Sequence, residues 1–344
     1  MVWCEAQVVT CETIRVRKER SQIFGVGGCS SKVERLPVEQ DVAGALPVSH
    51  PKEKHMNTNN LKLAIQKDGR LTDETLEFLR ASGISFESYK RKLFSTCRNF
   101  PMDIIYVRDD DIPGYVESGV VDLGILGQNV LNEERPKVKK LLNLRYGYCT
   151  LTLSVPKESD ITTASDLEGK TIATTYPRST EQFFASLGVF VKTVTIRGSV
   201  EITPSLGIAS AIVDLTSTGS TLTLNDLRPL IPIYRSEAVL IANENVSLNS
   251  QKQQILKQLL TRCKSVLSAR DYKYIVMNAP KSAVMKVKKI MPGITVNVVS
   301  IDPSSPTTQL SGVVKEDIFW SLYERLKTLG VSNLYMLPVK NIIS

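Results

Sequence analysis

The sequence predicts an α/β protein with an open, mostly parallel sheet, followed by a C-terminal module of a different type. From Leu61 onward, short apolar stretches alternate with helical stretches across short connections, which is typical of a parallel sheet covered by helices. Residues 271–344 instead follow the order strand, helix, strand, strand, helix, strand, which indicates a ferredoxin-like βαββαβ module. The chain has 344 residues, enough for two or three domains.

The composition is that of a globular protein. Hydrophobic residues make up 42% and charged residues 23% of the chain, and no apolar run approaches the roughly 20 residues that span a bilayer. The net charge of +8 is dispersed, without the aromatic-interleaved basic stripe typical of nucleic-acid binding. We therefore expect small polyanionic substrates, and neither nucleic acid nor a membrane as a partner.

The cysteine and histidine content limits the kinds of catalytic and metal sites that the chain can form. None of the six cysteines forms a CxxC pair, which argues against a zinc site or a disulfide framework and fits a reducing cytoplasm. The only histidines, His50 and His55, precede Met56, so residues 56–344 contain none. This excludes Ser-His-Asp and Cys-His catalysis, and histidine-based metal sites, from that part of the chain.

Residues 1–55 differ from the rest of the chain. They contain a glycine cluster and scattered prolines, and they show no lasting hydrophobic period. We expect this extension to be disordered or to lie outside the fold, with Met56 as a plausible true start.

The first predicted strand, Leu61–Ile65, ends in a basic loop. Lys67, Gly69 and Arg70 follow the strand, and a helix is expected over 72–82. The loop is either an anion contact or a solvated basic turn.

Two further strands end in loops of a similar kind. Asp103–Val107 leads into Arg108 and the aspartates at 109–111, which either cap the next helix or hold a metal ion. The stretch 120–129 is a buried strand that ends in a glycine-containing loop before a helix. Open parallel sheets bind ligands at the carboxyl ends of their strands, where these loops lie.

The remaining elements follow the same alternation. Further strands are expected over 148–155, 171–175, 190–196, 231–234 and 237–243, and helices over 180–187 and 251–269. The strand over 148–155 is long enough to cross between domains. In the C-terminal module, strands are expected over 274–278, 295–301, 309–314 and 334–339, and helices over 283–291 and 317–329.

The stretch 198–225 carries the strongest local pattern. A buried strand, Ala211–Leu215, is followed by a loop of serine, threonine and glycine and then by a helix start. Free N–H groups and the positive end of a helix favour a phosphate there. Asp214 at the strand end could bind sugar hydroxyls or, through water, Mg²⁺. The alternative is a Ser/Thr-rich turn that only caps a helix.

Taken together, seven motifs in order resemble the long form of ATP phosphoribosyltransferase, the first enzyme of histidine biosynthesis. The resemblance runs from about Leu61 to Ile343 and has no counterpart for 1–55. The motifs are QKDGRL at 66–71, VRDDDIP at 107–113, VVDLGILGQNVL at 120–131, TIATTYP at 171–177, GSVEITP at 198–204, VDLTSTGSTL at 213–222 and YKYIVMNAP at 272–280.

The resemblance implies a reaction and an architecture. The family joins phosphoribosyl pyrophosphate to N1 of ATP and releases pyrophosphate, with Mg²⁺ as cofactor. Its catalytic part has two α/β domains of the periplasmic-binding-protein type (type II) that form a cleft. Here these correspond to 56–150 with 230–268, and to 151–229, and residues 271–344 correspond to the regulatory domain. We further expect inhibition by histidine, a homo-oligomer between dimer and hexamer, and a cytoplasmic location.

The resemblance also assigns roles to residues by position. For phosphoribosyl pyrophosphate these are Asp214, Thr216, Ser217, Thr218, Gly219, Ser220 and Thr221; for ATP, Lys67, Gly69, Arg70 and Tyr176; and for catalysis, Arg70, Arg108, Asp122 and Glu201. Asp214 is also the candidate for contact with Mg²⁺, which arrives on the substrate pyrophosphate. Asn278 is a candidate histidine contact, or simply a polar strand end.

Two departures from the family pattern keep other functions open. Ser210 and Gln128 stand where the family commonly has acidic residues, and we expect altered metal or substrate affinity rather than loss of function. An inactive regulatory paralogue is the main alternative. A small-molecule-binding protein of the same architecture is a second alternative, against which the phosphate-loop pattern argues.

Overall fold

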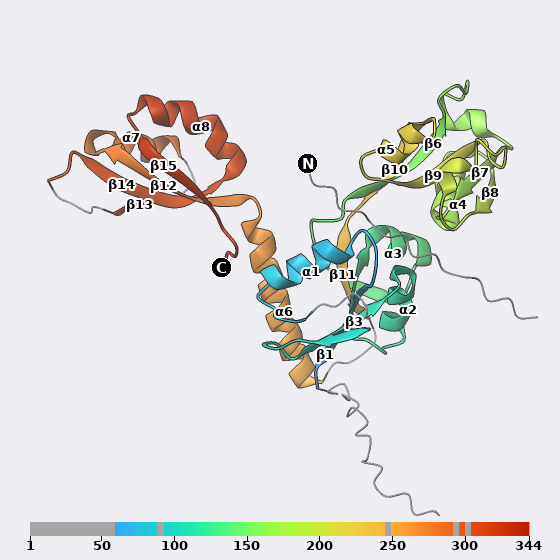
Figure 1. Cartoon of the computed structure of the whole chain (residues 1–344), viewed down its shortest axis with the longest axis horizontal. Helices are drawn as coiled ribbons and strands as arrows, with labels where there is room; N and C mark the ends of the chain where they lie inside the picture. The colour runs from blue at the N-terminus through green and yellow to red at the C-terminus, as the bar shows by residue number, and fades with distance from the viewer. Residues whose placement is uncertain (1–58, 88–92, 245–248, 292–295, 300–303, 344) are drawn as a thin grey trace, which may run out of the picture. The chain divides into compact units, whose positions relative to one another are not determined.

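The computed structural model describes residues 59–87, 93–244, 249–291, 296–299 and 304–343. The expected extension over 1–55 lies outside these residues. The described chain forms three sheets, each with its own helices (Figure 1). We call the six-stranded sheet with its helices the first lobe and the five-stranded sheet with its helices the second lobe.

The first lobe is built on a mixed sheet. Its strands lie in the order β2 (Phe94–Thr96), β3 (Met102–Val107), β1 (Leu61–Gln66), β4 (Leu123–Gly127), β11 (Ala238–Asn243) and β5 (Val138–Asn143). Only β3, β1 and β4 run parallel, and the other three pair antiparallel with their neighbours. The expectation of a mostly parallel sheet therefore holds for the centre of the sheet and not for its edges.

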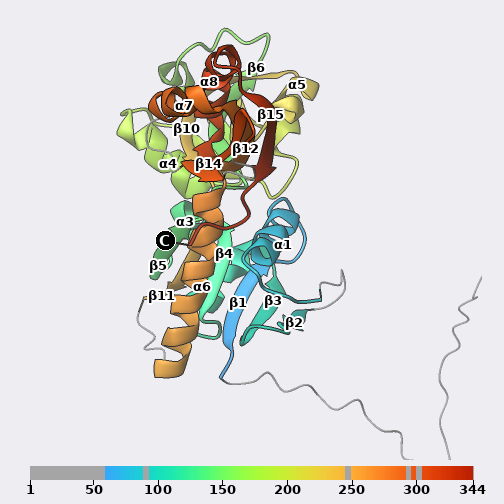
Figure 2. The same ribbon diagram turned by 90° about the vertical axis from the view of Figure 1, so that its left-hand side faces the viewer.

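Helices cover both faces of this sheet because its central strands are apolar on both sides. Leu63 and Ile65 of β1 pack with α1 (Thr72–Ala81) and α6 (Ser250–Ala269), and Figure 2 shows α6 running along the sheet. Ala64 faces the opposite cluster, which includes Ile112 of α2 (Ile112–Glu117) and Val130 of α3 (Gln128–Glu134). Successive strand residues point to opposite faces, so each apolar residue of β1 has a partner layer.

The second lobe repeats this plan on a smaller scale. Its strands lie in the order β10 (Leu227–Ser236), β6 (Cys149–Pro156), β9 (Ala211–Thr216), β7 (Thr171–Thr174) and β8 (Lys192–Thr195). β9, β7 and β8 are parallel, whereas β6 and β10 are antiparallel additions. The helices α4 (Pro177–Ser186) and α5 (Ser220–Leu224) follow β7 and β9.

The strand β10 departs from the expected domain division. Residues 230–236 were expected in the first domain, yet β10 pairs along its length with β6 of the second lobe. The chain enters the first lobe only at β11, whose Ala238 N–H donates to the Tyr146 carbonyl at 2.9 Å. The two connections between the lobes therefore lie side by side, near Tyr146 and Glu237.

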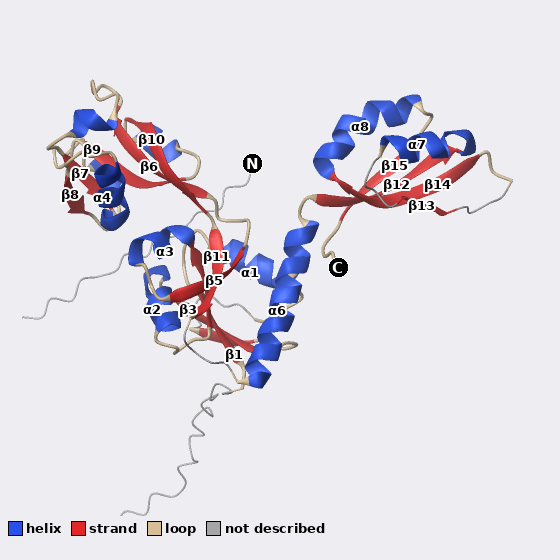
Figure 3. Cartoon of the chain, turned by 180° about the vertical axis from the view of Figure 1, so that it is seen from behind, coloured by secondary structure: helices blue, strands red, loops and turns tan. Residues whose placement is uncertain are grey.

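The C-terminal sheet confirms the ferredoxin-like order. β12 (Tyr272–Pro280), α7 (Val284–Ile290), β13 (Val296–Val299), β14 (Thr307–Lys315), α8 (Glu316–Thr328) and β15 (Ser332–Pro338) follow one another. The sheet order is β13, β14, β12, β15, with antiparallel neighbours throughout. Both helices cover one face (Figure 3), where Ile275 and Met277 pack against Phe319 and Leu326.

No helix within the described ranges is both long enough and apolar enough to span a bilayer.

Candidate active site

The loop after β9 forms a small cavity of about 410 Å³ in the second lobe. Predicted site residues make up most of its lining: the catalytic candidate Glu201, and the substrate candidates Asp214, Thr216, Ser217, Thr218, Gly219 and Thr221. Gly219 is the N-cap residue of α5 with φ of 76°, and a Cβ there would meet nothing within 4 Å. The left-handed backbone, rather than a lack of space, is what requires glycine at the start of this helix.

The hydroxyl groups of this loop fall into two classes. Thr216 is held by strand neighbours, since its hydroxyl lies 2.9 Å from that of Thr152 and also bonds the Thr150 carbonyl. Thr218 and Ser220 lie beyond the strand and are exposed, with their hydroxyls 3.0 Å apart. Ser220, alone among the predicted loop residues, does not line the cavity. The exposed hydroxyls are therefore the ones available to a phosphate.

Two carboxylates share this cavity. Asp214 comes from the end of β9, and Glu201 comes from a short 3-10 helix over Val200–Ile202. Burial, and to a lesser degree the charge of Glu201, raise the pKa of Asp214 to about 6, although a hydrogen bond from the backbone of Leu215 lowers it. Acids beside a phosphate loop repel the phosphate, unless they bind sugar hydroxyls or a metal ion that the phosphates carry.

The basic loop of the first lobe reaches this cavity. Arg70 Nη1 donates a hydrogen bond of 2.7 Å to the hydroxyl of Ser217, which joins two loops that lie 147 residues apart in the sequence. Gly69 permits the turn, because its φ of 143° is a backbone conformation that other residues rarely adopt. The Lys67 N–H donates to the Val107 carbonyl at 2.8 Å, so Lys67 and exposed Arg108 leave the sheet from adjacent strands.

Tyr176 lies close to Asp214 of this cavity. Burial raises the pKa of its phenol, and the negative charges of Asp214 and Asp109 raise it further. Asn129 Nδ2 donates to its hydroxyl at 3.3 Å. Tyr176 and Asp214 of the second lobe thus face Asn129 and Asp109 of the first.

The sequence did not single out Asp109 and Asn129 as site residues. The sequence predicts Asp109 only as a helix cap or, with its two neighbours, as a metal ligand. Burial and the charge of Asp110 raise its pKa, which marks it as the most enclosed position of that loop. Asn129 stood within a recognised motif, but its amide carries no signal by itself.

Asp122, which was predicted for catalysis and for the cleft, does not lie with this group. It precedes β4, whereas the ligand-binding loops follow the carboxyl ends of the parallel strands. Asp122 Oδ2 accepts from the Lys62 N–H at 2.8 Å and from Lys252 Nζ at 2.8 Å. Asp122 therefore ties the start of α6 to the amino ends of β1 and β4.

The two departures from the family pattern also lie away from the cavity lining. Ser210 precedes β9, and its N–H donates to the Thr171 carbonyl at 2.9 Å at the amino end of that strand. Gln128 begins α3, where its side chain bonds Asn132 at 3.0 Å and Lys140 at 3.1 Å. An effect of Ser210 on substrate affinity therefore has no direct contact in the structure to support it.

Asn278 lies in the C-terminal sheet, half-buried in β12 opposite Gln309 of β14. Its proposed contact with histidine stays a prediction. Among the described residues, no group of three or more Asp, Glu, His or Cys side chains is arranged to hold a metal ion. The pair Asp214 and Glu201 supplies oxygen ligands of the kind that Mg²⁺ prefers, but only two of them.

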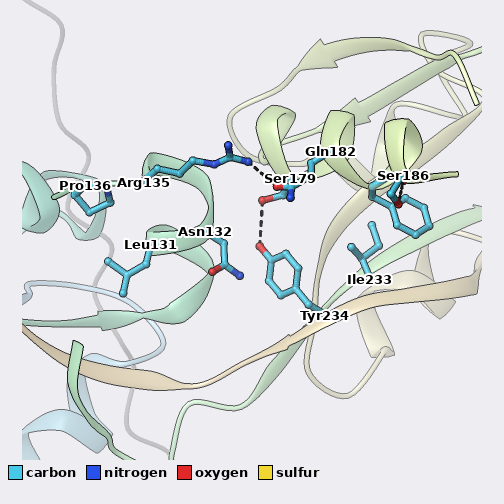
Figure 4. A pocket seen from close by; sticks show the side chains of 10 residues that line it. Leu131, Asn132, Arg135, Pro136, Ser179, Gln182, Ser186, Ile233 and Tyr234 are labelled. Atoms are coloured by element: carbon cyan, nitrogen blue, oxygen red, sulfur yellow. Dashed lines mark hydrogen bonds between the residues drawn. The ribbon is translucent and has the colours of Figure 1, made fainter. Parts of the chain in front are cut away.

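A second cavity, of about 720 Å³, contains none of the predicted residues (Figure 4). It lies among α3, α4 and β10, and it is lined by Leu131, Asn132, Arg135, Pro136, Ser179, Gln182, Phe183, Ser186, Ile233 and Tyr234. It has one basic side chain, Arg135, and no acidic one. The phosphate-loop cavity remains the better candidate, because it holds the predicted residues and Arg70 binds to its loop.

Comparison with known structures gives three similar proteins. The chain is similar to the ATP phosphoribosyl transferase (HisG:HisZ) complex from Thermotoga maritima, with 28% identity and a TM-score of 0.50 over 59% of this chain and 98% of that one. Arginine-bound ArgBP from T. maritima matches with 15% identity and a TM-score of 0.39, over 60% and 95% of the two chains. The periplasmic VFT2 domain of BvgS from Bordetella pertussis matches with 16% identity and a TM-score of 0.40, over 59% and 87%.

Sequence-family comparison covers about two thirds of the chain with two adjoining matches. Residues 108–265 match ATP phosphoribosyltransferase, and residues 269–341 match the HisG C-terminal domain. The first match includes the phosphate loop, Tyr176 and Glu201, and the second covers the ferredoxin-like module. The chain therefore belongs to the ATP phosphoribosyltransferase family, pentosyltransferases of histidine biosynthesis.

Proposed function

We propose that this chain transfers the 5-phosphoribosyl group of phosphoribosyl pyrophosphate to N1 of ATP, with release of pyrophosphate, as the first step of histidine biosynthesis. The observation that carries this proposal is the hydrogen bond of 2.7 Å between Arg70 and Ser217. It brings a basic loop from one lobe onto the phosphate loop of the other, where two acids are also present. A site for a sugar with phosphates at both ends needs all three parts.

Each part has a role in the proposed reaction. The 5-phosphate binds to the loop over 217–221, through exposed hydroxyls and the free N–H groups at the start of α5. Asp214 and Glu201 hold the ribose hydroxyls. Lys67, Arg70 and Arg108 neutralise the pyrophosphate as it leaves, and Tyr176 lies on the side where the adenine must enter.

The reaction needs alignment more than it needs a nucleophile on the protein. Displacement at the anomeric carbon passes through a cation-like sugar, while negative charge grows on the leaving pyrophosphate. Fixed cations and helix N–H groups stabilise that charge, and the residues of the two lobes align N1 of adenine with the carbon under attack. The absence of histidine from 56–344 is compatible with this mechanism, because no step requires an imidazole.

Magnesium enters the proposal as the complex with pyrophosphate. Asp214 and Glu201 would hold it together with oxygen atoms of the substrate, and it would neutralise charge on the leaving group. Asp214 is suited to this only when ionised, which makes its raised pKa functionally relevant.

The C-terminal module is the proposed site of feedback inhibition by histidine, with Asn278 as a candidate contact. It is also a candidate oligomer interface. The sheet face that α7 and α8 leave uncovered carries Tyr274, Tyr335 and Leu337, which are 37%, 60% and 51% exposed. An exposed apolar sheet face supports association with a second copy, within a homo-oligomer between dimer and hexamer. We place the enzyme in the cytoplasm, where its proposed substrates are made.

A steady-state assay with ATP, phosphoribosyl pyrophosphate and Mg²⁺ tests the proposal, with the N1-adduct followed by its absorbance. We expect turnover that requires Mg²⁺ and that histidine suppresses. Turnover insensitive to histidine would retain the enzyme and remove the regulatory role. No turnover by folded protein would favour an inactive regulatory paralogue, and binding of an amino acid or sugar without phosphoribosyl pyrophosphate would favour a solute-binding protein.

A further inference from the structure

Helix α4 lacks an N-terminal cap of its own. Its N-cap residue, Tyr176, makes no side-chain cap hydrogen bond, and Pro177 has no N–H. The Thr180 N–H donates to the Tyr176 carbonyl at 3.0 Å. This leaves the N–H groups of Arg178 and Ser179 without a partner inside the helix.

One carboxylate of the first lobe accepts a hydrogen bond from each of these two N–H groups. Glu133 Oε1 accepts from the Arg178 N–H at 2.8 Å, and Glu133 Oε2 accepts from the Ser179 N–H at 3.0 Å. Glu133 lies near the end of α3 and is only 7% exposed. Burial of a carboxylate is costly without hydrogen bonds, and the positive end of α4 supplies two of them.

The contact also runs in the opposite direction. Arg178 Nη1 donates to the backbone carbonyls of Glu133 and Glu134, each at 3.2 Å. These are the last carbonyls of α3, which ends where Arg135 adopts a left-handed conformation with φ of 50°. Arg135 in turn donates to Gln182 of α4 at 2.5 Å (Figure 4). The two helices therefore cap each other across the lobes.

Polar contacts dominate on this side of the helix pair. The cavity of about 720 Å³ lies beside them, with the hydroxyls of Ser179 and Tyr234 3.3 Å apart at its wall (Figure 4). An open space of this size lacks the close side-chain contacts by which a packed core fixes the relative orientation of two helices. The relative placement of α3 and α4 therefore depends on the mutual caps.

The capped helices carry residues of the candidate active site. Tyr176 directly precedes α4, and Asn129, which donates to its hydroxyl at 3.3 Å, lies one turn before Glu133 on α3. We propose that Glu133 is a positioning residue, which acts through the cap of α4 to hold Tyr176 against Asn129 and beside Asp214. This inference rests on the proposed function, since it assumes that Tyr176 faces a substrate.

Substitution at Glu133 tests the inference, with its neighbour as a matched control. Glu133→Ala removes both acceptors, whereas Glu134→Ala removes an exposed side chain and keeps the backbone carbonyl. We expect Glu133→Ala to lower kcat/KM about 10- to 100-fold, as a misplaced substrate contact does, and Glu134→Ala to match the wild type. Glu133→Gln should resemble Glu133→Ala, because its NH₂ group faces one of the helix N–H groups.

A double substitution shows whether Glu133 acts through Tyr176. If it does, Glu133→Ala combined with Tyr176→Phe loses little more kcat/KM than Tyr176→Phe alone. Multiplied losses would contradict the positioning role. Hydrogen exchange measures the cap directly: Glu133→Ala should speed exchange at the N–H groups of residues 178 and 179, and Glu134→Ala should not. Unchanged exchange would overturn the cap.

These outcomes separate the inference from the proposed function. Wild-type turnover with equal activity of Glu133→Ala and Glu134→Ala refutes the positioning role and keeps the enzyme. Absence of wild-type turnover refutes the proposed function and the positioning role with it, whereas the exchange data still decide whether Glu133 caps α4.

Discussion

Asp214 and Glu201 place two acids in the cavity where a phosphate is proposed to bind. Burial and the neighbouring charge together favour the protonated form of Asp214, so its pKa of about 6 lies close to neutral pH. A substrate that brings a metal ion or sugar hydroxyls would favour the ionised form instead. The protonation state of Asp214 is therefore linked to substrate binding.

This linkage predicts a pH dependence. Since the raised pKa means that Asp214 loses its proton only as the pH passes about 6, kcat/KM should rise between pH 5 and pH 7 and then level off. Glu201→Gln removes a negative charge that raises this pKa, so the rise should move to lower pH in that variant. A pH–rate series on both proteins measures this, and a shift to higher pH would contradict the assignment.

The contact between Arg70 and Ser217 predicts that removal of the Arg70 side chain weakens the stabilisation of the transition state. Arg70→Ala should lower kcat/KM by on the order of 100-fold, because one preorganised charge contact is worth about 2–4 kcal/mol. Ser217→Ala should cost less, since Arg70 can still reach a bound pyrophosphate. The control is Arg98→Ala, which removes an exposed arginine that pairs with Glu87 in the same lobe. Equal kinetics for Arg70→Ala and Arg98→Ala would refute the role of Arg70.

At the scale of elements, the amino and carboxyl ends of the parallel strands have different roles. The carboxyl ends of β1, β3, β7 and β9 lead into the residues gathered at the candidate site. The amino ends of β1 and β4 are held by the pair Asp122 and Lys252, whose side chains are 8% and 14% exposed. Asp122 therefore contributes to the stability of the first lobe.

We therefore expect substitution of Asp122 to change the stability of the protein rather than its catalysis. Asp122→Ala leaves Lys252 buried without its partner, which costs about 3–5 kcal/mol of unfolding free energy. Urea unfolding should show this loss, while kcat/KM of the folded variant stays near the wild-type value. Asp226→Ala is the control, because Asp226 pairs with Lys157 at an 89% exposed side chain and should cost less than about 1 kcal/mol. A large fall in kcat/KM of folded Asp122→Ala would restore the catalytic assignment.

The sequence predicted the elements that pack in the core better than the edge strands. The apolar strands β1, β4 and β9 and the amphipathic helix α6 stand at almost their predicted positions, because burial requires a clear pattern. It did not predict β2, which has three residues, or β5, which carries Lys139 and Lys140 on exposed positions. Short or charged edge strands are defined by pairing with distant segments, and a local pattern cannot show that.

The same limit explains what was missed in the candidate site. The loop over 216–221 could be predicted, because a strand, a glycine loop and a helix start are adjacent in sequence. Asp122 was assigned to the cleft by the family resemblance alone, although it precedes the buried strand of its own motif. The sequence does not indicate a role for Glu133, since its partners at 178 and 179 come from another lobe and are backbone groups without a side-chain signal.

For the whole molecule, the uncovered face of the C-terminal sheet predicts association. Leu337→Asp puts a charge on that face, so it should shift the protein toward a smaller assembly in sedimentation or light scattering. Met285→Asp is the matched control, because Met285 is 76% exposed on α7, on the opposite side of the sheet. Equal masses for the two variants and the wild type would exclude this face as an oligomer contact.

The mutual cap of α3 and α4 has a consequence for recombination between relatives. The Glu133 carboxylate binds main-chain N–H groups, and Arg178 binds main-chain carbonyls, so neither needs a particular side chain as its partner. A chimera that takes its second lobe from a diverged relative should keep this junction, provided that a proline and an arginine begin the helix that replaces α4. At this junction, one glutamate in α3 and one arginine in α4 are then the compatibility rule.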